Sequence, residues 1–86
     1  MTTKPPSASQ EFPADSLEKI AYASVASIPT EEPNDRNRLG YHIWRWLTSR
    51  QGTLEEAVSE SGSRMQISRQ EAVKIVRAEL QKRGIQ

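Results

Sequence analysis

The chain has 86 residues, of which 35% are apolar and 27% are charged, so it is long enough for one small domain but not for a deep two-sided cleft. It has no apolar run near the roughly 20 residues that a membrane span requires, no signal-peptide core at its N-terminus and no cysteine. We therefore expect a cytoplasmic protein without disulfides, thiolate metal sites or membrane segments.

The net charge of +1 is unevenly distributed along the chain. Residues 1–35 hold two lysines and six acidic residues, a net charge of −4, whereas residues 36–86 hold ten Lys or Arg and five Glu, a net charge of +5. This asymmetry favours either an anionic partner for the basic half or attraction between the two halves within one fold. Both explanations are consistent with the sequence.

The first 14 residues are rich in Pro, Ser and Thr and are expected to form a disordered tail, because they cannot bury enough apolar surface to fold. Residues 15–86 are expected to form a single helical domain. Its first helix is predicted over residues 16–28, with Asp15 as the N-cap, Glu18 as its capping-box partner and Pro29 as the stop. The apolar face recurs at three- and four-residue intervals and comprises Leu17, Ile20, Ala21, Ser24 and Ile28.

The second helix is predicted over residues 36–51, capped by Asn34 or Asp35 and ended by Gly52. Gly40, inside this helix, has a cost in helix stability that a close helix crossing would explain. The predicted buried stripe of the helix is Leu39, Ile43, Trp46 and Leu47.

Two further helices are predicted, over residues 54–62 and 69–83. Thr53 and Glu56 have capping-box spacing at the start of the third helix, and Ser68 and Glu71 have it at the start of the fourth. Residues 61–63 are compatible either with a turn or with a helix that continues to Gln66. The core face of the fourth helix is Ala72, Val73, Ile75, Val76 and Leu80. The predicted fold class is all-α, with the last three helices forming a trihelical, helix-turn-helix-like core.

A polar stripe on the fourth helix has the composition of a DNA-reading surface. Gln70, Lys74, Arg77 and Gln81 recur three or four residues apart, on a face that we predict to lie opposite the core, and Arg69 precedes them in the first turn. Arg and Lys can donate to guanine, Gln can pair with adenine, and a helix N-terminus favours phosphate. An ordinary solvated helix face would also account for the stripe.

The sequence resembles the winged-helix branch of the helix-turn-helix superfamily over about residues 39–85. The resemblance lies in Thr53-Leu-Glu-Glu-Ala and in the segment from Ile67-Ser-Arg to Arg83-Gly-Ile85. It implies that the helix starting at Arg69 enters the major groove, while the short helix before it crosses the DNA backbone. The connection before Ser68 is longer than in a tight helix-turn-helix, and the resemblance includes no β-wing.

The second helix interleaves basic and aromatic residues. Tyr41 and Trp44 fall off the line of its buried stripe and are predicted as anchors for a protein partner, because Tyr and Trp are enriched in interface hot spots. Arg45 and Arg50, together with Arg64, are predicted to contact phosphates. Dimerisation through this helix, or single-stranded nucleic acid stacked on its aromatic rings, are alternative uses.

No catalytic, cofactor-binding or metal-binding residues are predicted. His42 is the only histidine and has no second ligand at metal-binding spacing, and the glutamates of the third helix are expected to be a solvated face. We therefore expect a non-catalytic binding module. The leading hypothesis is a DNA-binding transcriptional regulator or accessory factor, acting as a homodimer or in a complex; the alternative is a protein-interaction adaptor or small accessory subunit.

Overall fold

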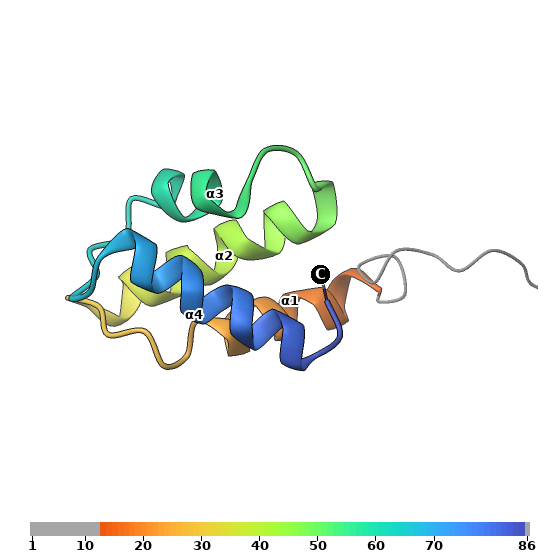
Figure 1. The fold of residues 1–86 in the computed structure, drawn as a ribbon, viewed down its shortest axis with the longest axis horizontal. Helices are drawn as coiled ribbons and strands as arrows, with labels where there is room; N and C mark the ends of the chain where they lie inside the picture. Colours follow the sequence, from red (N-terminus) through yellow and green to blue (C-terminus); the bar gives the residue numbers. More distant parts are fainter. Residues whose placement is uncertain (1–12, 86) are drawn as a thin grey trace, which may run out of the picture.

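The structure is a computed structural model that describes residues 13–85, which form four α-helices joined by loops (Figure 1). The helices are α1 (Ala14–Ser24), α2 (Pro33–Ser49), α3 (Leu54–Glu60) and α4 (Arg69–Lys82). The predicted all-α class is confirmed, since these residues contain no strand and only one isolated β-bridge, between Thr30 and Met65. None of the described helices combines the length and the apolar character that crossing a membrane requires. The predicted tail, residues 1–14, lies outside the described residues except at Pro13 and Ala14.

The four helices form a ring of neighbours around one apolar core. α1 packs on α2 and on α4, and α3 packs on the same two helices (Figure 1). The core therefore includes α1 as well as the last three helices, whereas the sequence predicted a core formed by the last three helices. The apolar side chains buried in it are Leu17, Ala21, Val25, Ile28, Leu39, Ile43, Leu47, Leu54, Ala57, Val58, Ala72, Val73, Val76, Leu80 and Ile85.

Both predicted ends of the first helix are wrong. α1 begins at Ala14 after Pro13, which makes no side-chain cap, so Asp15 lies inside the first turn and is not the N-cap. The helix ends at Ser24 rather than at residue 28. The Ser24 hydroxyl donates to the Ala21 carbonyl at 2.7 Å, and the next amides bond three residues back, as Val25 does to Tyr22. Such local bonds replace the helical pattern before Pro29 is reached.

The predicted ends of the second helix are also corrected. Its N-cap is Glu32, and Asp35 is the third helical residue, with the two side chains forming a reciprocal capping box. Pro33 fits the first helical position because its missing N–H has no partner to lose there. At the other end the helix stops at Ser49, since Arg50 takes the left-handed conformation (φ 56°) and Gly52 follows in the loop.

The starts of the last two helices agree with prediction. Thr53 and Glu56 form the predicted capping box of α3, and the Ser68 hydroxyl accepts the Glu71 N–H at the start of α4. α3 is shorter than predicted and ends at Glu60, so that Ser61 and Gly62 form a turn. α4 ends at Lys82, one residue before the predicted end.

Gly40 marks a close crossing of α1 and α2, as its place in the sequence suggested. The ring of Tyr22 lies against the Cα of Gly40, and a Cβ at this position would overlap the ring, with Tyr22 Cε1 only 2.7 Å away. The close approach therefore depends on the missing side chain, which outweighs the helix-propensity cost of glycine.

We predict that Gly40→Ala destabilises the protein. Overpacking against Tyr22 costs about 1–3 kcal/mol, and the better helix propensity of Ala offsets up to about 1 kcal/mol of it. Urea unfolding followed by circular dichroism measures the change. Asn37→Ala, at an exposed position of α2, is the propensity control, and Tyr22→Leu should restore part of the stability of Gly40→Ala. A more stable Gly40→Ala protein would contradict the close crossing.

Candidate functional site

The connection between α3 and α4 is held by one buried carboxylate, that of Asp35 in α2. Its side chain has no exposed surface. Oδ2 accepts the Glu32 N–H at 3.1 Å and lies 3.2 Å from Arg64 Nη2, while Oδ1 accepts the Arg64 N–H at 3.2 Å and lies 3.2 Å from Arg38 Nη1. The carboxylate thus joins the start of α2 to a residue in the middle of the connection.

Backbone bonds extend this attachment on both sides of Arg64. The Glu31 N–H donates to the Arg64 carbonyl at 2.9 Å, and the Gln66 N–H donates to the Pro29 carbonyl at 2.9 Å. The Ser63 hydroxyl donates to the Asp35 carbonyl at 2.6 Å. Residues 63–66 are therefore bonded to the loop between α1 and α2 and to the start of α2, shortly before α4 begins.

Desolvation and hydrogen bonding act in opposite directions on Asp35. Burial raises the pKa of the Asp35 carboxyl. This rise is outweighed by the hydrogen bonds from the Arg64 N–H and guanidinium, by the Arg64 charge and by the hydrogen bond from the Glu32 N–H. The pKa of Asp35 therefore lies below its ordinary value of 3.8. Asp35 is therefore ionised at neutral pH and provides the anionic partner of Arg38 and Arg64.

The polar stripe of α4 is exposed and borders an open groove of about 600 Å³. Its position differs from the prediction in one respect: the stripe flanks the core on the side toward α3 and does not lie opposite it. The buried Val73 contributes to the groove beside Lys74 and Arg77, and Glu55 of α3 lines the other side. Residues 70, 74, 77 and 81 are about a quarter turn from the core positions 73, 76 and 80, which explains this placement.

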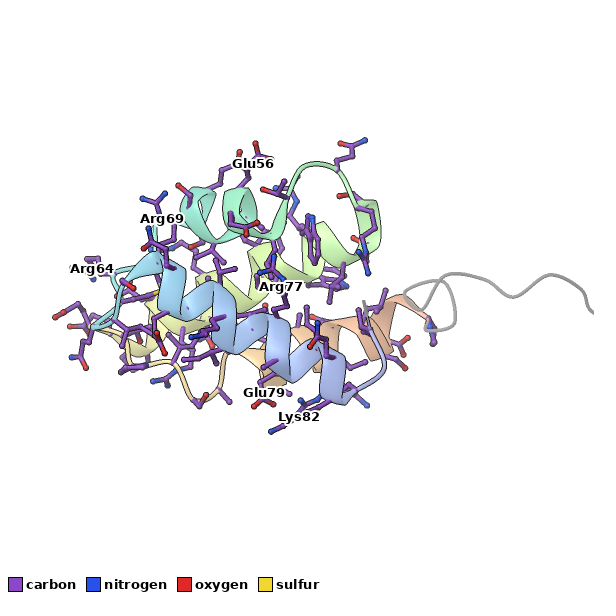
Figure 2. All side chains as sticks on the ribbon, viewed as in Figure 1. Glu56, Arg64, Arg69, Arg77, Glu79 and Lys82 are labelled. Carbon is purple, nitrogen blue, oxygen red and sulfur yellow. The ribbon has the colours of Figure 1, made fainter. Side chains whose placement is uncertain are left out.

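The cations along α4 differ in whether a carboxylate holds them. Arg77 Nη2 lies 3.2 Å from Glu55 Oε2, with both side chains about half exposed. Arg69 and Lys74 are exposed and make no ion pair within residues 13–85. Figure 2 shows Arg69 and Arg77 on the side of α4 that faces α3, and Glu79 and Lys82 on its other edge.

The three other predicted phosphate contacts are not gathered at this groove. The guanidinium of Arg64 binds Asp35, although 66% of the side chain stays exposed. Arg45 lies 5.9 Å from the centre of the Tyr41 ring, and Arg50 lies 4.7 Å from that of Trp46. Each of these arginines therefore has a structural contact, and their phosphate role stays a prediction.

The aromatic residues of α2 divide between core and surface. Trp46, predicted to be buried, packs against the core but is only half-buried, and its Nε1–H donates to the Gly52 carbonyl at 3.1 Å. Trp44 is half-buried against the core, and Tyr41, with its side chain edge-on to Trp44, is 44% exposed. Of the two residues predicted as anchors, Tyr41 is exposed and Trp44 is half-buried, and their role in binding stays a prediction.

Two important groups were missed by sequence reasoning. Asp35 was considered only as an N-cap, and Glu55 only as part of a solvated acidic face. The sequence pattern does not reveal the partners of these two carboxylates, because Arg64 is 29 residues from Asp35 and Arg77 is 22 residues from Glu55. A second hollow, of about 310 Å³ and mainly apolar, adjoins the groove at Arg77 and Gln81 and is lined by Trp46, Leu54, Leu80, Gly84 and Ile85.

The described residues contain no group of three His, Asp or Glu side chains that could hold a metal ion. No family model, no curated protein and no solved structure matches this chain. What the chain binds has therefore to be argued from its own residues.

The pKa of Asp35 makes stability depend on pH. Because this pKa is lower in the folded chain than in the unfolded one, the stabilisation by the carboxylate is complete above about pH 4 and is lost as the pH falls toward the folded-state pKa. Urea unfolding at pH 7 and near pH 3 measures the loss. Asp35→Asn should be less stable than the wild type at pH 7 and lose less stability on acidification. Equal pH dependence of the two proteins would contradict a charged Asp35 in the folded state.

Proposed function

We propose that this protein is a non-catalytic module that binds duplex DNA through the face of α4 that borders the groove. The observation that carries the proposal is the exposure of Gln70, Lys74 and Arg77 along one side of a helix whose first turn also presents Arg69. These residue types match the hydrogen-bonding groups of guanine, adenine and phosphate.

The arrangement of α3 and α4 supports a helix-turn-helix-like use of this face. α3 packs against α4, and α4 starts at a capped N-terminus with Arg69 and Gln70 in its first turn. In such a use α4 enters the major groove while α3 lies near the DNA backbone. The connection of residues 61–68 is longer than a tight turn, and its attachment to Asp35 provides the rigidity that a short turn would otherwise give.

The charge of the face predicts modest affinity. Lys74 and Arg69 are the cations along α4 without an ion pair in the described part of the chain, and Arg64 adds a partly exposed guanidinium near the start of the helix. One copy with this small number of phosphate contacts binds DNA weakly. We therefore propose that the protein acts as a homodimer or in a larger complex, either as a transcriptional regulator or as an accessory factor. Arg45 lies in α2 and Arg50 directly follows it, and the proposal does not depend on them.

We predict that Lys74→Ala combined with Arg77→Ala weakens binding to duplex DNA and lowers the slope of log affinity against log salt by about 1 for each cation that no longer neutralises a phosphate. Fluorescence anisotropy with a labelled duplex at several salt concentrations measures both quantities. The matched control is Lys82→Ala combined with Arg83→Ala, which removes the same charge from the C-terminal end of the helix, where both residues pair with Glu79.

The control variant should bind more tightly than the groove variant. An equal loss of affinity in the two variants would indicate a general charge effect and remove the assignment to the groove. No measurable binding of the wild type to duplex DNA at roughly 50 mM salt would overturn the proposed function.

A second candidate function is binding of a protein partner through α2. It is favoured by Tyr41, a residue that is 44% exposed and whose ring contacts both Trp44 and His42. An exposed aromatic ring on a rigid helix is a typical anchor of protein interfaces.

For this candidate we predict that a pull-down recovers one stoichiometric protein, that nuclease treatment leaves the amount unchanged, and that Tyr41→Ala abolishes the capture. Tyr41→Ala is a cleaner test than Trp44→Ala, because Trp44 also packs against the core. Lys74→Ala is the control, since its side chain belongs to the α4 groove. Capture that survives Tyr41→Ala or disappears with nuclease would exclude this use of α2.

A further inference from the structure

Glu55 is the one acidic side chain of α3 that lines the α4 groove, and it holds Arg77 there. We propose that Glu55 competes with DNA phosphate for Arg77 and so limits the affinity of the α4 site. This inference rests on the proposed DNA-binding function and extends it to how strongly the site binds.

The geometry places the competition inside the site. Arg77 Nη2 donates to Glu55 Oε2 at 3.2 Å, and the two side chains remain 49% and 56% exposed. The pair is therefore accessible to solvent and to an incoming ligand, and it lines the groove together with Lys74 and Gln81. A phosphate that reaches this part of the groove meets an arginine whose guanidinium is already engaged and a carboxylate that repels it.

The surroundings of Glu55 favour its charged form. The pKa of the Glu55 carboxyl lies below its ordinary value, mainly because of its own backbone N–H and secondly because of the hydrogen bond from Arg77. The residue follows Leu54 in the first turn of α3, where a negative charge is favoured. The Glu55 carboxylate is thus charged at neutral pH, so its negative charge remains in the groove.

An exposed ion pair of this kind is weak, so phosphate can displace it. The cost of breaking it corresponds to about a two- to five-fold change in an equilibrium constant. Removing the carboxylate should strengthen binding by about this factor, because Arg77 then has no competing partner. The salt dependence should also become steeper, since one more cation is neutralised only by the DNA.

The test compares Glu55→Gln with a matched charge change in the same groove. Glu71 also lines the groove and makes no ion pair within residues 13–85, so Glu71→Gln removes one negative charge without releasing an arginine. Affinity for one labelled duplex is measured by anisotropy for the wild type, for both variants, and for each variant combined with Arg77→Ala. Urea unfolding checks that all of them fold.

We expect Glu55→Gln to bind about two- to five-fold more tightly than the wild type and more tightly than Glu71→Gln, and we expect this excess gain to vanish in the Arg77→Ala background. Unchanged affinity of Glu55→Gln, or a gain that persists without Arg77, would overturn the competition while leaving DNA binding in place. If neither the wild type nor any variant binds the duplex, the proposed function itself fails, and the inference fails with it.

Discussion

The ion-pair cluster around Asp35 is the interaction on which the placement of α4 depends. A carboxylate with no exposed surface is tolerated only where charges and hydrogen bonds compensate for its desolvation, and here Arg64, Arg38 and the Glu32 N–H provide them. Because Arg64 lies in the middle of the connection before α4, the compensation is possible only when that segment lies against the start of α2. The electrostatic requirement of one side chain thus determines a tertiary arrangement.

This constraint also clarifies the uneven charge of the chain. Among the described acidic residues before residue 36, Asp35 is the one that forms ion pairs with the basic residues 36–86. Arg77 instead pairs with Glu55, which lies in the same half of the chain. Attraction between the two halves is therefore concentrated at one buried point. Arg69 and Lys74 remain exposed along α4, which leaves the basic half with cations for an external partner.

The predictability of the fold differed between local and long-range features. The starts of α3 and α4 followed from Thr53 and Ser68, because a cap is a contact between residues three apart. The end of α1 was misplaced, since the Ser24 side-chain bond that accompanies it has no distinct sequence signal. The exposed stripe of α4 was predicted as a set, but the partner of Arg77 was not, because that pair joins two helices whose relative position the sequence pattern does not give.

We propose that this protein binds its partner through the side of α4 that borders the groove. Titration of ¹⁵N-labelled protein with duplex DNA, followed by amide chemical shifts, tests this directly, because each residue that has a backbone N–H reports separately. We expect the largest shifts at Arg69, Gln70, Lys74 and Arg77, with little change at Tyr41. Largest shifts around Tyr41, or no shifts at all, would contradict it.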